Sequence, residues 1–76
     1  MHIRHDRENN IAYIRFQPKA VGVETIVISS DLNIDLAPDG TLYGIELLNA
    51  NEQLAGDGGV LQFLNANTNQ LKEFPI

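Results

Sequence analysis

Short runs of alternating apolar and polar residues, separated by turn residues, follow one another along the first two thirds of the chain. Alternation with a period of two is typical of antiparallel strands that have one buried and one wet face. The clearest case is residues 32–37, where aliphatic side chains alternate with Asn33 and Asp35. The pattern predicts five strands, at residues 2–5, 11–16, 21–28, 32–37 and 41–48.

The last of these runs, residues 41–48, differs from the others because it is apolar on both faces and contains Gly44. A strand that is apolar on both faces lies centrally in a sheet or is covered on its second side. A glycine inside a strand marks a bulge or a close approach of another group. At the level of the sequence, these choices stay open.

The alternation ends after the fifth run, and helix signals follow it. Asn49 is in position to cap a short helix over residues 50–55. Glu52 stands three residues later as a capping-box partner, and Gly56 fits as the C-terminal stop. We therefore predict a short helix directly after the last strand.

The C-terminal segment has two interpretations. The apolar residues among 60–64 fit one face of a short helix, and they fit an apolar strand as well. The asparagine-rich residues 65–69 are a poor helix interior, so the segment is short in either case. We predict an α+β, mainly β fold, in which an antiparallel β-meander of about five strands is followed by one or two short C-terminal helices. We expect residues 2–54 to form the core and residues 55–76 an arm that packs on the core or on a neighbouring subunit.

The small size of the chain bears on its stability. It has 76 residues and no cysteine. A domain of this size buries only about 60% of the surface that its unfolded chain exposes, so it is marginally stable. Without cysteine, disulfides and thiolate metal sites are excluded. Of the remedies that small domains use, oligomerisation remains, and we expect a homo-oligomer, either a dimer or a larger assembly.

The charge balance narrows the classes of partner. The formal net charge is −5, and the five basic residues form no aromatic-interleaved stripe, so we expect no nucleic-acid partner. An acidic surface suits solubility or docking onto a basic protein. No stretch approaches the roughly 20 apolar residues of a membrane helix, and the N-terminal residues contain no apolar run. We expect no membrane segment, no signal peptide and a cytoplasmic location.

The ionisable residues form no convincing metal site. His2 and His5 are an odd number of residues apart in a strand, so they point to opposite faces and do not chelate one ion. Asp31, Asp35 and Asp39 recur every four residues, but apolar residues lie between them, unlike the ligands of a calcium loop. We interpret these carboxylates as the wet face of a strand and a turn. We expect no metal and no cofactor.

Glu46 is the most unusual of the carboxylates because it lies in an otherwise apolar strand. We expect it to pair with Arg15 or Arg4 across the sheet. Nothing places a nucleophile or an oxyanion donor beside it, so we expect the protein not to be an enzyme and to have no catalytic residues. The alternative is a small-ligand or weakly catalytic pocket lined by Glu46, Tyr43 and Arg15.

Aromatic and arginine side chains provide candidate interface residues, because these types are enriched where proteins meet. The candidates are Tyr13, Arg15, Tyr43, Phe63 and Leu64. For the two tyrosines an equal alternative is that they complete the core with their hydroxyl groups in water.

Four segments carry a resemblance to a known family. They are Ile3-Arg4-His5-Asp6, Ala12-Tyr13-Ile14-Arg15-Phe16, Glu24-Thr25-Ile26 and the run from Asn33 through Pro38-Asp39-Gly40 to Asn49-Ala50. With them, residues 2–54 resemble domain of unknown function 2283, a family of small, uncharacterised, mostly bacterial proteins. The resemblance implies no activity, cofactor or catalytic residue. Some members are similar in size and gene context to antitoxin-like partners of small toxin-like proteins.

These observations together favour a non-catalytic, homo-oligomeric protein-interaction module. A first alternative, from the charge and the family resemblance, is an antitoxin-like acidic partner of a small basic protein. A second alternative is the small-ligand binder or weak enzyme described above.

Overall fold

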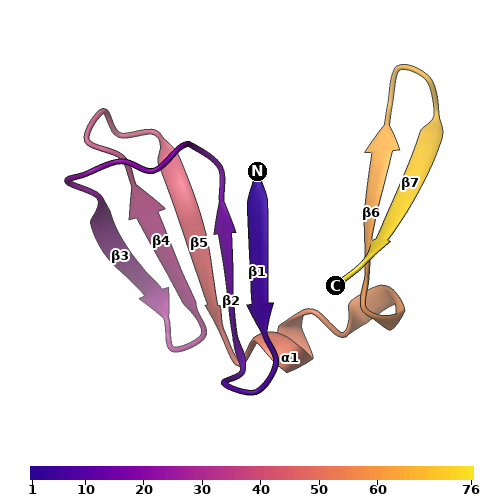
Figure 1. The fold of residues 1–76 in the computed structure, drawn as a ribbon, viewed down its shortest axis with the longest axis horizontal. Helices are drawn as coiled ribbons and strands as arrows, with labels where there is room; N and C mark the ends of the chain where they lie inside the picture. The colour runs from indigo at the N-terminus through magenta and orange to yellow at the C-terminus, as the bar shows by residue number, and fades with distance from the viewer.

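A five-stranded antiparallel sheet forms the main body of the computed structural model, which describes residues 1–76 (Figure 1). Each strand coincides with one of the alternating runs, so the prediction of a mainly β fold with five antiparallel strands is confirmed. The strands are β1 (His2–Asp6), β2 (Ile11–Arg15), β3 (Glu24–Ser29), β4 (Leu32–Leu36) and β5 (Leu42–Leu48).

The strand order differs from that of the predicted meander. Across the sheet it is β1-β2-β5-β4-β3, so β2 and β3 are consecutive in sequence but not adjacent in space. Residues 16–23 cross one end of the sheet to reach the far edge, and β3, β4 and β5 then return to pair with β2 (Figure 1). The meander prediction is wrong here because alternation locates strands without fixing which strands pair.

One row of side chains crosses the sheet from edge to edge and consists entirely of isoleucine. Each of its members is the register partner of the next, and directly paired residues on neighbouring strands project to the same side of the sheet. The row comprises Ile3, Ile14, Ile45, Ile34 and Ile26. Two residues along the strands, on the same side, Leu47 lies between Ala12 and Leu32. We call this side of the sheet the isoleucine face.

Gly44 lies in the central strand β5, which accounts for the apolar character of both faces of that strand. It pairs with Asp35, whereas the next pair is Leu36 with Leu42, so Tyr43 is the extra residue of a β-bulge. The two sequence interpretations of Gly44, bulge and close approach, are both correct, because the ring of Tyr13 also lies against its backbone.

The helix that follows β5 is shorter than predicted. It is α1 (Ala50–Gln53), and it lies against the end of the sheet near the β1–β2 turn (Figure 1). Asn49 makes no side-chain capping bond to the backbone; it has a left-handed φ of 56° and its side chain donates to Glu52 instead. The capping acceptor comes from elsewhere, because the Oδ1 atom of Asn10 receives the backbone N–H of Asn51 at 2.8 Å. The capping box prediction is therefore wrong.

The prediction of one or two C-terminal helices is also wrong in its second part. A 3-10 turn, η1 (Gly56–Gly58), leads into a two-stranded hairpin of β6 (Val60–Asn65) and β7 (Gln70–Pro75). The asparagine-rich residues 65–69 form the hairpin loop, with Asn69 in the left-handed region at φ 56°, where asparagine is tolerated. The hairpin stands beside β1 as a separate arm (Figure 1).

No second layer covers the sheet. Only five of the 76 residues are buried, and the buried apolar ones are small or half polar: Ala12, Ala37, Tyr43 and Ala50. Stable domains bury the apolar side of a sheet against another sheet or helices. The single helix touches only one end, so one copy of the chain leaves its isoleucine face open.

Candidate functional site

The side of the sheet opposite the isoleucine face carries a hydrogen-bonded cluster centred on Asp35. We call this side the polar face. The Tyr13 hydroxyl donates to Oδ2 of Asp35 at 2.6 Å, and the Thr25 hydroxyl donates to Oδ1 at 2.6 Å. Burial raises the pKa of Tyr13 well above its ordinary value of 10.0, and the hydrogen bond and charge of Asp35 add to the rise. Both carboxylate oxygens of Asp35 are thus occupied by groups of its own chain.

Glu46 also has a partner on the polar face, but not the predicted one. The Nδ2 atom of Asn33, its register partner, donates to it at 2.8 Å. Neither Arg15 nor Arg4 forms an ion pair with Glu46, and the one ion pair in the structure joins Arg4 to Asp6 at 3.9 Å. The predicted pairing is wrong because Asn33 lies directly opposite Glu46 and donates a hydrogen bond to it, whereas Arg15 lies opposite Gly44.

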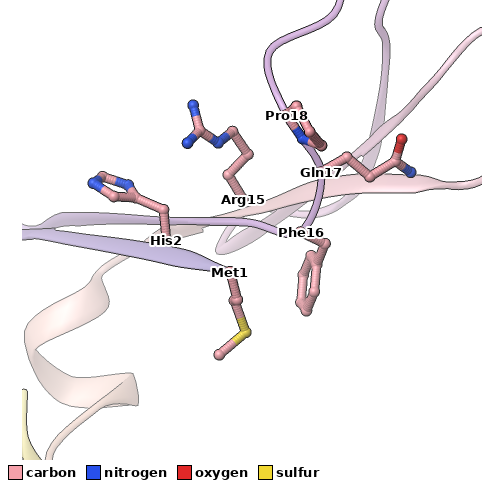
Figure 2. A pocket seen from close by; sticks show the side chains of 6 residues that line it. All are labelled: Met1, His2, Arg15, Phe16, Gln17 and Pro18. Carbon is pink, nitrogen blue, oxygen red and sulfur yellow. The ribbon is translucent and has the colours of Figure 1, made fainter.

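The largest hollow lies at the end of β1 and β2 and is open to solvent (Figure 2). Its six lining residues are Met1, His2, Arg15, Phe16, Gln17 and Pro18. His2 and Arg15 project to one side of the strands, whereas Met1 and Phe16 project to the other (Figure 2). Ligand sites depend on polar groups that converge on one point, and these side chains diverge around an edge.

The pocket suggested by the sequence, lined by Glu46, Tyr43 and Arg15, does not form. Arg15 lines the hollow just described, but Glu46 and Tyr43 do not. Tyr43 is buried at the bulge, and Glu46 is engaged by Asn33. The three residues therefore share no concave site.

The two histidines lie apart in their environments as well as in their directions. His2 lines the open hollow, and the Nε2 atom of His5 is 2.9 Å from Oδ1 of Asn51 in α1. His5 lies opposite Ala12 and projects to the same side of the sheet as the isoleucine row, and its Nδ1 atom is buried without a partner. His5 thus joins the edge strand to the helix at the rim of the isoleucine face.

Two of the carboxylates shape turns. Hydrogen bonds from Asn9 lower the pKa of Asp6 in the β1–β2 turn. Hydrogen bonds from the side chain and backbone of Thr41 lower the pKa of Asp39 in the turn before β5. Such Asx turns are a structural use of aspartate, in line with the interpretation of the Asp31, Asp35 and Asp39 series as a wet strand face and a turn.

The candidate interface residues fall into three places. Tyr13 and Arg15 lie on the polar face, Tyr43 is buried, and the other two are on the hairpin arm. Phe63 and Leu64 are 59% and 58% exposed, which is high for large apolar side chains. Their use as an interface remains a prediction.

The isoleucine face is the surface that sequence reasoning missed. Each strand shows an apolar side on its own, but the continuous row appears only when the five strands are set in register. The signal that could have found it is the recurrence of isoleucine at the centre of successive runs, at positions 3, 14, 26, 34 and 45. This face and the hairpin arm are the candidate functional surfaces of the molecule.

Comparison with known proteins agrees with the resemblance noted in the sequence. None of the helices has the length and the apolar character required to cross a membrane. Searches of curated proteins and of solved structures give no significant match. A family model matches residues 2–51, which comprise β1 to β5 and the start of α1 and leave out the hairpin arm. The chain belongs to the family described as protein of unknown function DUF2283.

Proposed function

We propose that this protein is a non-catalytic interaction module that works as a homo-oligomer, with the isoleucine face as its self-association surface. The observation that carries the proposal is the row of five isoleucines on a sheet side with no covering layer. Contiguous apolar patches of this kind are rare on proteins that act alone. A second copy supplies the missing layer, as in a β-sandwich.

The chemistry of the face favours a copy of the same chain as its occupant. In a twofold-symmetric dimer the same patch meets itself, so a uniform aliphatic surface is self-complementary. The chain carries a net charge of −5, yet the isoleucine face has a single carboxylate, Glu24, at its rim. Repulsion between copies is therefore weakest there. Each Å² of apolar surface removed from water stabilises the assembly by about 25 cal/mol.

The alternative of an acidic surface that binds a basic partner has less support. The carboxylates of Asp35 and Glu46 accept hydrogen bonds within the chain. Arg4 and Arg15 lie on the same side of the sheet in adjacent strands. Positive and negative groups are thus mixed on the polar face, whereas docking of a basic protein is favoured by a patch of one sign.

Sedimentation equilibrium on two neighbouring variants of β3 tests the proposal. Ile26→Asp places a charge on the isoleucine face, and Val27→Asp places the same charge on the opposite side of the same exposed edge strand. We expect a dimer or larger assembly for the wild type and for Val27→Asp, and a monomer for Ile26→Asp at micromolar concentration. A wild-type chain that sediments as a folded monomer contradicts the proposal.

A further inference from the structure

We infer that the hairpin arm of one copy packs on the β3 end of the isoleucine face of a second copy, with its Phe63 side over Ile26, while the paired sheets cover the rest of that face. This inference rests on the proposed homo-oligomer and specifies the contact within it. It joins two apolar surfaces that are both uncovered in a single copy.

Beyond its base, the hairpin arm is not covered by its own chain, because the last four residues of β6 and all six residues of β7 are exposed. A two-stranded hairpin alone is marginally stable at best in water. In the register of β6 and β7, Leu61 pairs with Phe74 and Phe63 pairs with Lys72, so these four side chains share one side. Phe63 and Phe74 are 59% and 48% exposed. A surface of this composition requires cover from elsewhere.

The base of the arm is tied in a position from which it covers neither face of its own sheet. The N–H of Ile76 donates to the carbonyl of Gly59 at 3.0 Å, and the Arg7 guanidinium of the β1–β2 turn donates to the carbonyl of Ile76. The Arg7 bond ties the base of the arm to the β1–β2 turn, and the arm stands beside the edge strand β1 (Figure 1). In this position the arm leaves the isoleucine face of its own sheet uncovered.

The area of the sheet favours participation by the arm. Five strands about 4.8 Å apart, with about five residues of 3.3 Å each, give a flat footprint of roughly 24 by 17 Å, or about 400 Å². A stable protein interface buries about 800 Å² on each partner. Because side chains project from the sheet, the accessible area of the face is larger than its flat footprint. One side of the hairpin adds a further footprint of about 10 by 20 Å.

Charge selects the orientation. Lys72 is the only basic residue after Lys19, and it lies on the same side of the hairpin as Phe63. Glu24 is the only carboxylate on the isoleucine face, and it lies two residues from Ile26 in β3, so both side chains project to the same side. Placing Phe63 of one copy over Ile26 of another brings these opposite charges together at the rim.

Cysteine cross-linking tests the contact, because the chain has no cysteine of its own. Two full-length variants, Phe63→Cys and Ile26→Cys, are mixed and oxidised, and the disulfide species are identified by mass spectrometry. Both positions are exposed, so the variants are expected to fold. The control pairs Phe63→Cys with Val21→Cys, a 90% exposed loop position outside both surfaces. We expect the Phe63–Ile26 disulfide between chains to be the main product and the control disulfide to be minor.

The outcomes separate this inference from the proposed function. A chain that sediments as an oligomer, but in which Phe63 and Ile26 cross-link no more than the control pair, overturns the inference and leaves the homo-oligomer in place. A monomer overturns both. A double variant that carries both Phe63→Cys and Ile26→Cys completes the test. If a disulfide forms within that chain but not between the two single variants, the inference is also overturned, because the arm then folds onto its own sheet. As a second measurement, Lys72→Glu is expected to weaken self-association about five- to tenfold, and Glu24→Lys in the same chain is expected to restore it.

Discussion

The ring of Tyr13 lies directly against the backbone of Gly44. A Cβ atom at position 44 would stand 2.6 Å from Cζ and 2.9 Å from Cε1 of the tyrosine. Gly44 does not have a positive φ, so its role is to leave space and not to allow an unusual backbone conformation. The space lets the Tyr13 hydroxyl cross the central strand and reach Asp35 on the next one.

Gly44→Ala is expected to destabilise the fold by about 1–3 kcal/mol, the usual range for overpacking, because the added methyl group displaces the tyrosine ring. The free energy of unfolding in urea measures the change. In a Tyr13→Ala background the clash is absent. There Gly44→Ala is expected to be neutral or to stabilise by about 0.5–1 kcal/mol, since alanine loses less entropy than glycine in a strand. Equal effects of Gly44→Ala in both backgrounds would contradict the steric account.

Tyr13 is also expected to make stability depend on pH in the alkaline range. Its pKa in the folded state is raised above the ordinary value of 10.0, mainly by burial and also by Asp35. In the unfolded chain the tyrosine ionises first as pH rises, so the unfolded state then binds fewer protons than the folded state. Stability is therefore present in full below about pH 10 and falls above it.

Urea unfolding measured between about pH 7 and pH 11 checks this expectation. Tyr13→Phe is expected to be less stable near neutral pH and to lose part of the decline above pH 10. Tyr43→Phe is the matched control, because it removes the other of the two tyrosines. An identical alkaline decline in all three proteins would show that Tyr13 is not responsible.

The strands could be predicted from the sequence because alternation is a local property. Leu32–Leu36 reads as a strand from its own five residues, whatever lies beside it. The pairing of β2 with β5 could not be predicted in this way, since the connection formed by residues 16–23 contains no information about where its far end pairs. The isoleucine row depends on that pairing and on the register of four strand pairs, so the recurrence of isoleucine along the chain could suggest the row but not establish it.

The C-terminal region shows a different limit. Val60, Phe63 and their apolar neighbours satisfy a helical and an extended pattern equally, so periodicity alone could not decide between them. The decision comes from the loop, where Asn69 adopts a left-handed conformation that closes a hairpin. Likewise, the helix cap was assigned to Asn49 by local spacing, whereas the acceptor comes from Asn10, about forty residues away in sequence. Contacts between distant segments escape local reasoning.

Asn10 has two separable roles at the junction between the sheet and α1. Its φ is 59°, and its side chain accepts the N–H of Asn51. Asn10→Ala removes the cap and disfavours the left-handed backbone, so we expect a loss of about 1–3 kcal/mol in the free energy of unfolding. Asn10→Gly removes the cap and the hydrogen bond from Nδ2 of Asn10 to Asn49, as alanine does, but keeps the left-handed backbone accessible, so we expect a smaller loss. If alanine were tolerated better than glycine here, the assigned backbone role would be wrong.

The edge strand β3 is expected to control aggregation. All six of its residues are exposed, and one side of its backbone has no strand partner. Exposed apolar edges pair with other chains, and a lysine on the edge opposes such pairing. Val27 is 72% exposed and projects from the polar face, so Val27→Lys leaves the isoleucine face unchanged. We expect this variant to aggregate at a higher temperature than the wild type, as measured by light scattering during heating, with stability changed by less than about 0.5 kcal/mol.

Val21→Lys is the control for this last experiment, because it adds the same charge at an exposed loop position. Both variants lower the net negative charge by one, which by itself weakens repulsion between chains. An effect of charge alone would therefore shift the two variants equally and toward easier aggregation. Protection by Val27→Lys but not by Val21→Lys would locate the aggregating contact at the backbone edge of β3. Equal behaviour of the two variants would place that contact elsewhere.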